Sequence, residues 1–197
     1  MKLGEWCAVR SGLTLRVRPS GASPSGVLAV QQSDLSPDGE FLRPQAIRVN
    51  VPTRTPHRIA HDELVFRSRG PFWCAWAPGA FDEPIVAVAP LFVLRPAPEI
   101  DPAYLAWFIS RPSAQRYFDA HAMGSGVQMI SKSALQNLPV DVPSLAAQRS
   151  IVAIARTAQE ERQLAVRHAL LHHTLISTAL DEAAKRTRST PEQERTP

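Results

Sequence analysis

Residues 145–186 have the sequence LAAQRSIVAIARTAQEERQLAVRHALLHHTLISTALDEAAKR, and this run contains neither proline nor glycine. Because those two residues interrupt helices most strongly, the run predicts one helix of 42 residues, which would be about 63 Å long. Ser144 follows a proline and is a suitable N-cap. Helices of globular domains average about 11–12 residues. We therefore expect most of this helix to extend beyond the domain that precedes it.

Apolar residues recur along this helix at spacings near 3.5, the period of a coiled coil. The sequence therefore predicts a spacer helix that pairs with a partner helix. The alternative interpretation is a helix that packs on its own globular domain. The side chains expected at the helix–helix contact are Ile151, Ile154, Leu164, His168, Leu171 and Leu175.

Residues 1–143 differ in composition, because they hold 16 of the 18 prolines and all nine glycines. Short apolar runs alternate there with turn residues, which is typical of a strand-rich domain. We therefore expect an α+β fold in which a mixed, strand-rich domain over 1–143 precedes the long helix over 144–186. The polar residues 187–197 are expected to form a disordered tail.

Turn residues and apolar patterns place the individual elements. Asp101 and Pro102 predict the cap and first position of a helix, and Pro112 predicts its end. Further short helices are expected over 113–122 and over 131–137, the second capped by Ser131. Strands are expected over 13–17, 27–31, 47–51, 64–67, 72–77, 85–94, 127–130 and 138–142.

Composition narrows the functional classes. The sequence has no run of 18 apolar residues and no apolar signal segment at its start, so we expect neither a membrane span nor secretion. Cys7 and Cys74 form no Cys-x-x-Cys motif, which argues against a disulfide framework or a cysteine zinc site. These features favour a cytoplasmic protein. A formal net charge of +4, with 19 arginines and three lysines, suits a surface that binds phosphates or bases.

Common enzyme signatures are missing from the sequence. It has no Walker A loop, no Asn-Pro-Pro-Tyr or Asp-Pro-Pro-Tyr motif, and no acidic residue two positions before a lysine, as metal nucleases commonly have. His168 and His172 have the i, i+4 spacing of metal ligands, but no third ligand is evident nearby. We therefore expect solvated or packed histidines there, no metal site and no catalytic residues.

Three segments resemble the DNA specificity (S) subunits of type I restriction–modification systems. They are LGEWC at 3–7 with RSGLTLR at 10–16, DELVFRSRG at 62–70, and GSGVQMISK at 124–132, which Leu135, Leu138, Pro139, Pro143 and Gln148 follow. In that family the last run closes the target recognition domain and leads into the spacer helix. The resemblance covers roughly residues 3–180 and implies a non-catalytic, DNA-reading subunit.

The usual family member carries two recognition domains and two spacer helices, whereas this chain contains one of each and no internal repeat. The resemblance therefore implies a half-subunit that forms a homodimer and reads a bipartite target in double-stranded DNA. It also implies a methyltransferase (modification) subunit as partner, with a restriction or translocase subunit as a further candidate. The methyltransferase would bind S-adenosylmethionine and methylate adenine, so this chain would need no cofactor of its own.

Basic, amide and small side chains supply the candidate DNA contacts. Arginine pairs with guanine and glutamine with adenine in the major groove. Alternating arginines that precede Gly70 suit insertion into a groove, and a Gly-Ser-Gly run lets backbone approach a phosphate. The predicted set is Arg10, Arg16, Arg18, Gln31, Gln32, Arg67, Ser68, Arg69, Gly124, Ser125, Ser131 and Lys132.

Three alternatives remain open from the sequence. The chain could be a recognition module of another phage-defence assembly, which genomic neighbours would reveal. It could be a stand-alone nuclease that uses His57, His61 and Asp62, which metal-dependent cleavage by the purified chain would favour. It could also be a scaffold built on the long helix, without DNA binding.

Overall fold

The computed structural model describes residues 1–15, 26–42, 47–51, 57–79, 81 and 83–188, which belong to two compact units. The first unit is Met1–Val152 and the second is Ala153–Pro197. Every described strand belongs to the first unit, and the second is helical as far as Arg188. An α+β fold with one long helix is therefore confirmed. The tail predicted over 187–197 lies outside the described residues, except that the helix includes its first two residues.

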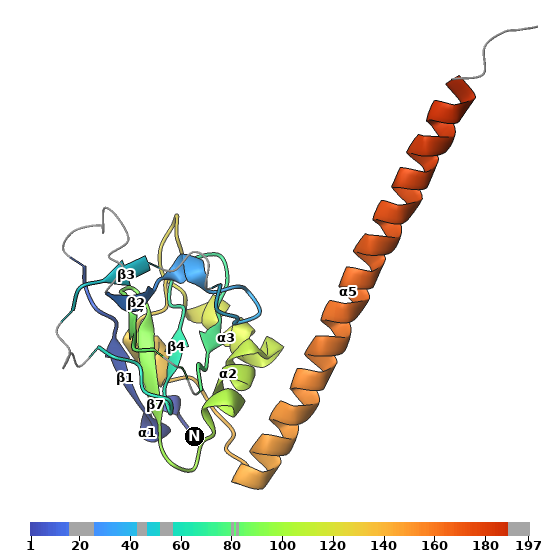
Figure 1. Ribbon diagram of the computed structural model, residues 1–197. Coiled ribbons are helices and arrows are strands. Elements are labelled where there is room, and N and C mark those ends of the chain that lie inside the picture. Colours follow the sequence, from blue (N-terminus) through green and yellow to red (C-terminus); the bar gives the residue numbers. More distant parts are fainter. Residues whose placement is uncertain (16–25, 43–46, 52–56, 80, 82, 189–197) are drawn as a thin grey trace, which may run out of the picture. The chain divides into compact units, whose positions relative to one another are not determined.

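The first unit contains a four-stranded antiparallel sheet (Figure 1). Its strand order is β1 (Cys7–Ser11), β7 (Phe92–Pro96), β4 (Leu64–Phe66) and β5 (Ala75–Trp76). Leu94 of β7 pairs with Val9 on one side and with Leu64 on the other. All three side chains are buried in the hydrophobic cluster that faces the helices. One face of this sheet therefore contributes to the main core.

The first unit also contains a second sheet of three strands. It has the order β3 (Ile47–Val49), β2 (Val27–Val30) and β6 (Ile85–Ala87), where β2 is antiparallel to β3 and parallel to β6. Val65 and Val93 of the first sheet are buried with residues of β2 and β6. Because successive side chains of a strand alternate between faces, the first sheet packs on helices with one face and toward the second sheet with the other.

Short helices complete the first unit, and their starts agree with the local sequence. Asp101 accepts hydrogen bonds from the backbone N–H groups of Ala103 (2.8 Å) and Tyr104 (3.3 Å), which confirms it as the cap. The ring centroids of Phe66 and Phe118 lie 5.2 Å apart, joining sheet to helices. The helices are α1 (Leu3–Trp6), α2 (Pro102–Ser110), α3 (Pro112–His121) and α4 (Lys132–Gln136), with a 3-10 turn, η1 (Gln32–Asp34).

Five of the predicted strands are wrong in whole or in part, and one of these, predicted over 72–77, reduces to the two residues of β5. Residues 85–94 form no single strand but contribute β6 and β7 to different sheets, with Pro90 in the turn between them. Proline has no N–H to donate to a ladder, so the apolar run breaks there. Of residues 13–15 only Leu13 makes a bridge, to Val88, and the expected strands over 127–130 and 138–142 reduce to isolated bridges at Met129 and Pro139.

The long helix α5 (Leu145–Arg188) begins where the sequence predicts. Ser144 caps it, since its hydroxyl accepts from the N–H of Ala147 at 3.4 Å. Ile151 and Val152 in its first two turns pack against the core of the first unit. In the described residues no helix is both long and apolar enough to cross a membrane.

Candidate nucleic-acid interface

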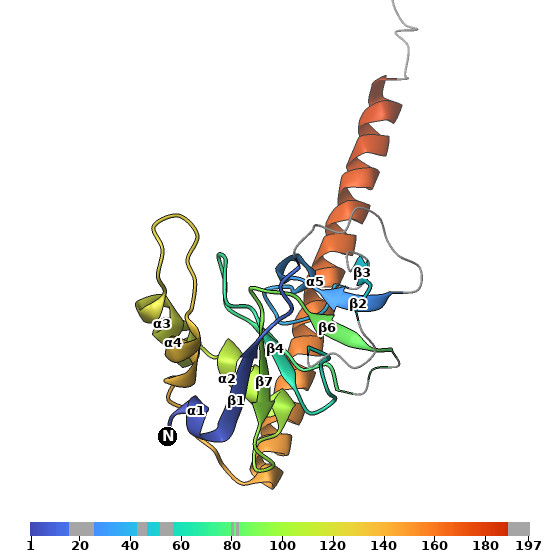
Figure 2. The ribbon, with the colours of Figure 1, turned by 90° about the vertical axis from the view of Figure 1, so that its left-hand side faces the viewer.

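Two loops that are more than 50 residues apart in sequence lie side by side in the first unit. Here they are called the reading loops, residues 67–70 and 123–130. The N–H of Gly70 donates to the carbonyl of Gln128 (3.0 Å), and the N–H of Ile130 donates to the carbonyl of Ser68 (2.8 Å). Met123 and Met129 exchange two further backbone hydrogen bonds of 2.9 Å each. The second loop is therefore a closed hairpin fixed to the first, and Figure 2 shows it as the yellow loop beyond α3.

The tips of the reading loops present small, basic and apolar groups to solvent. Arg69, Gly124 and Ser125 are exposed, as is Lys132, the first residue of α4. Gly124 has a φ of +114°, a conformation that side-chain-bearing residues rarely adopt. Three apolar side chains of the hairpin are also exposed: Met123 by 54%, Val127 by 53% and Met129 by 40%. Three of the predicted residues are thus exposed on the joined loops and Lys132 is exposed two residues beyond the second loop, together with three apolar residues that were not predicted to contact DNA.

Arg67 has different surroundings from Arg69, although both were predicted to contact DNA. Its guanidinium donates to the carbonyls of Gln32 (2.9 Å), Leu35 (3.3 Å) and Arg69 (3.2 Å). It also lies 4.0 Å from the centre of the Phe72 ring. Burial lowers the pKa of Arg67 from its usual value. Arg67 therefore supports the reading loop from within, and Arg69 is the arginine that this loop exposes.

Other predicted DNA contacts lie apart from the loop tips. Ser68 is 1% exposed and its hydroxyl donates to the carbonyl of Pro90, so it is a buried structural residue rather than a surface contact. Arg10 pairs with Glu63, which directly precedes β4, whereas the reading loop follows that strand. The positions Arg16 and Arg18 lie outside the described residues.

The other predicted polar residues are Gln31, Gln32 and Ser131. Gln31 donates its backbone N–H to the Asp34 carboxylate (2.8 Å), and the side-chain oxygen of Gln32 is buried without a hydrogen-bond partner. Both glutamines are half-buried. Ser131 caps α4 by accepting from the N–H of Ala134 at 3.1 Å, as predicted. These residues border the reading loops or their supports but present less side-chain surface than Arg69 or Lys132.

The predicted contact residues of the long helix divide into two groups. Ile151 packs against the core of the first unit, so it is not part of the free helix surface, contrary to expectation. Ile154, Leu164, Leu171 and Leu175 are between 58% and 71% exposed.

The rings of His168 and His172 are nearly parallel, with centroids 6.2 Å apart. Among the described residues no group of three or more His, Cys, Asp or Glu could hold a metal ion.

Comparison with solved structures identifies the architecture. Over 92% of its length the chain matches a structure from a study of the assembly and conformational transition of a type I R-M system, with a TM-score of 0.59 and 20% identity. It also matches the HsdS subunit from Thermoanaerobacter tengcongensis over 81% of its length, with a TM-score of 0.53 and 20% identity. The chain has the fold of a type I S subunit.

A third structure has the same S-subunit fold. The type I restriction–modification S subunit from M. genitalium matches 81% of this chain, with a TM-score of 0.54 and 13% identity. This chain covers only 43%, 36% and 38% of the three S-subunit-like structures, so it spans less than half of their length. No family model and no curated protein sequence matches the chain.

Proposed function

We propose that this chain is a non-catalytic, sequence-specific DNA-recognition subunit that acts as half of a type I specificity subunit. The observation that carries the proposal is the pair of joined reading loops in an S-subunit fold, which expose Arg69 and Ser125, with Lys132 exposed just after the second loop. Fold alone does not assign function. The exposed cations and hydrogen-bonding groups supply the chemistry that DNA binding needs.

Reading requires contacts to base edges and contacts to phosphates, and the reading loops offer both. Arg69 would make a bidentate contact with a guanine in the major groove, the commonest specific contact. Lys132 and Ser125 would hold phosphates on either side. The exposed Met123 and Val127 would contact thymine methyl groups or sugars, since apolar side chains also distinguish bases in the major groove.

The surface of α5 supports pairing with a second copy of the chain. At 100° per residue, the exposed Ile154, Leu164, His168, Leu171 and Leu175 fall within one sector of about 100°. That width suits an apolar face that packs on one partner helix. A homodimer formed through this face would carry two identical readers related by two-fold symmetry. Such a dimer would prefer a bipartite, palindromic target with a gap between its half-sites.

A second apolar sector of the same helix supports a further partner. The exposed Val166, Leu170, Ile176 and Leu180 fall within an adjoining sector of about 120°. A helix pair covers one face of each helix, so this sector would remain open in the dimer. We assign it to the methyltransferase subunit, which would bind S-adenosylmethionine and methylate adenine at the site that the dimer selects. A restriction or translocase subunit would join this assembly through the methyltransferase.

The test needs the DNA target first. Methylation-sensitive sequencing of DNA from cells that hold this protein and its methyltransferase partner would identify the modified site. Binding of the purified complex to that site and to scrambled DNA would then be compared for the wild type and the variants Arg69→Ala and Arg149→Ala. Arg149 is an exposed arginine at the start of α5 and serves as the matched control.

Arg69→Ala should weaken binding to the cognate site by about 1–3 kcal/mol, which is roughly 5- to 150-fold, because a bidentate base contact is lost. Binding to scrambled DNA should change much less, and Arg149→Ala should leave both affinities unchanged. Equal losses on cognate and scrambled DNA would show that Arg69 holds phosphates. Absence of any preferred site in the methylation map would contradict the proposed function.

A further inference from the structure

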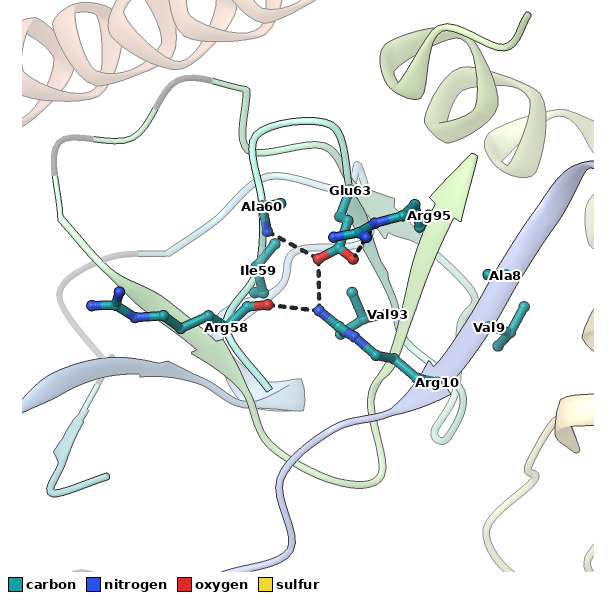
Figure 3. Close-up of a pocket in the computed structure, with 9 residues that line it drawn as sticks. All are labelled: Ala8, Val9, Arg10, Arg58, Ile59, Ala60, Glu63, Val93 and Arg95. Atoms are coloured by element: carbon teal, nitrogen blue, oxygen red, sulfur yellow. Dashed lines mark hydrogen bonds and ion pairs between the residues drawn. The ribbon is translucent and has the colours of Figure 1, made fainter. Parts of the chain in front are cut away.

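The first unit contains an open pocket of about 650 Å³ at the start of β4. Here it is called the arginine pocket. It is lined by three arginines, one glutamate and apolar residues, and Figure 3 shows Arg10 and Arg95 beside the glutamate, with the backbone carbonyl of Arg58 next to Arg10. Its volume lies within the range of about 300–1,000 Å³ that is usual for small-molecule sites. The lining residues are Ala8, Val9, Arg10, Arg58, Ile59, Ala60, Glu63, Val93 and Arg95.

Glu63 has its hydrogen-bonding capacity filled from within the protein. It is 1% exposed, and one oxygen accepts from Arg10 (2.6 Å) and from the N–H of Ala60 (2.9 Å). Its other oxygen pairs with the Nε of Arg95 at 3.0 Å. A buried carboxylate held in this way positions the two guanidinium groups beside it, and it needs no external partner.

The guanidinium groups keep unused hydrogen-bonding capacity. The Nη1 of Arg10 and the Nε of Arg58 are buried and have no hydrogen-bond partner. Arg95 contacts Glu63 through Nε, while its side chain is 58% exposed. The guanidinium groups of Arg10 and Arg95 pair with the one carboxylate, whereas the Arg58 side chain points away from it (Figure 3). The pocket therefore has a surplus of positive charge and of donors, which an anionic group would satisfy.

The apolar lining limits what kind of anion fits. Val93 is a buried side chain of β7, Ala8 of the adjacent β1 shares its face of the sheet, and Ile59 is half-buried in the same cluster as Val93. A bare inorganic ion would leave this surface uncovered. A ligand with an acidic group and a compact apolar body would contact both parts of the pocket.

The arginine pocket is separate from the reading loops. Glu63 directly precedes β4, whereas Arg67 directly follows it, so the two sites lie at opposite ends of that strand. The arginine that the reading loop exposes, Arg69, does not line the pocket. A ligand could thus occupy the pocket whether or not DNA is bound, and the site can be tested without DNA.

We propose that the arginine pocket binds a small organic anion. A phosphate or carboxylate group accepts hydrogen bonds from Arg10 and Arg95, and an apolar body lies over Ala8, Val93 and Ile59. Such a ligand carries a planar carboxylate or a tetrahedral phosphate group next to a small apolar group. Phosphate-bearing and carboxylate-bearing ligands are separated by the probes used below.

Calorimetric titration of the full chain with phenyl phosphate and with benzoate tests this site, with phenol as the uncharged control. At least one of the two anions should bind, and phenol should bind at least tenfold more weakly because it lacks the charged oxygens. Binding of phenyl phosphate alone would assign the site to phosphates, and binding of benzoate alone would assign it to carboxylates. Failure of both anions, or equal binding of phenol, would overturn the proposal.

The variant Arg95→Gln locates the binding. It keeps the pair between Arg10 and Glu63 and changes an exposed side chain, so the first unit should stay folded. It should weaken binding of the anion about tenfold or more, whereas Arg149→Gln should have no effect. Unchanged anion binding by Arg95→Gln would contradict the assigned site. A matching loss of DNA affinity in this variant would place the pocket in the DNA interface and would also overturn the proposal.

Discussion

Arg67 shows how a charged side chain can support a loop instead of contacting a ligand. Its guanidinium donates to the carbonyls of Gln32 and Leu35 and stacks on Phe72. Charge-assisted hydrogen bonds of this kind contribute about 1.5–3 kcal/mol when they are shielded from water. Arg69, two residues further on, is exposed. The two arginines should therefore differ in what their removal does to stability.

Arg67→Ala should lower the free energy of unfolding of the first unit by about 1–3 kcal/mol, because hydrogen bonds to three carbonyls and a ring contact are lost. Arg69→Ala should change it by no more than about 0.5 kcal/mol. All four tryptophans lie in the first unit, so urea unfolding followed by tryptophan fluorescence reports on that unit. Equal destabilisation by the two variants would contradict the distinction between them.

The difference between these arginines could not be predicted from sequence. The Arg-Ser-Arg-Gly run indicated a loop rich in donors, and the loop is there. The acceptors of Arg67 lie 35 and 32 positions earlier in the chain, and no local pattern reveals them. Ser68 is buried for the same kind of reason, since its partner Pro90 comes from a distant turn.

At the scale of elements, Gln148 fixes the start of the long helix to the rest of the first unit. Its side chain is fully buried and accepts from the N–H of Asp101 at 2.8 Å. Its amide nitrogen donates to the carbonyls of Glu99 and Pro143, both at 2.8 Å. One side chain thus joins the first turn of α5 to the segment that begins α2.

Gln148→Leu keeps the approximate volume but leaves one backbone N–H and two carbonyls without their partner. Each unsatisfied buried group costs about 1–3 kcal/mol, so the loss of three partners should lower the free energy of unfolding of the first unit by about 3 kcal/mol or more. Gln163→Leu, at an exposed position further along α5, is the control and should have little effect on the first unit. Urea unfolding measures both. A change below about 0.5 kcal/mol for Gln148→Leu would exclude this role.

Local signals predicted helices better than strands. The starts at Asp101, Ser131 and Ser144 were predicted because a cap and its N–H partners lie within three residues of each other. Strand assignment failed over 85–94 because membership in a sheet depends on distant partners. β6 pairs with β2 and β7 pairs with β1 and β4, and an apolar run contains no information about which partner each half takes.

At the scale of the whole molecule, the described part of the second unit is one helix with a large exposed apolar surface. Eight of its large apolar side chains are at least 46% exposed, from Ile154 to Leu180. Apolar surface of this extent on a protein usually marks a site of association. The proposed homodimer would cover part of it, so its disruption should alter the oligomeric state without altering the first unit.

The double variant Leu171→Lys, Leu175→Lys should convert the dimer to a monomer, because it places two charges in the contact sector. Thr174→Lys lies on the same turn outside that sector and should leave the dimer intact. Light scattering on the full chain, with and without the methyltransferase partner, gives the mass. A wild-type monomer under both conditions would remove the dimer and the bipartite target with it, but it would not affect the reading loops.

The arginine pocket lies beyond what the sequence could predict. Arg10 was expected to hold DNA phosphates, but its partner Glu63 lies 53 residues away and its second acceptor, the carbonyl of Arg58, lies 48 residues away. The residues that surround it come from β1, β7 and the segment before β4. Only the folded sheet brings them together.

Main-chain hydrogen bonds join the reading loops to each other. Amide and carbonyl groups are the same in every residue type apart from proline, so the bonds between the loops persist when the exposed side chains are exchanged. Natural variation could therefore replace Arg69, Ser125 or Val127 and create a new target preference while the frame stays intact. Under the proposed function, exchange of a few surface side chains would therefore alter the DNA sequence that the protein prefers without altering its fold.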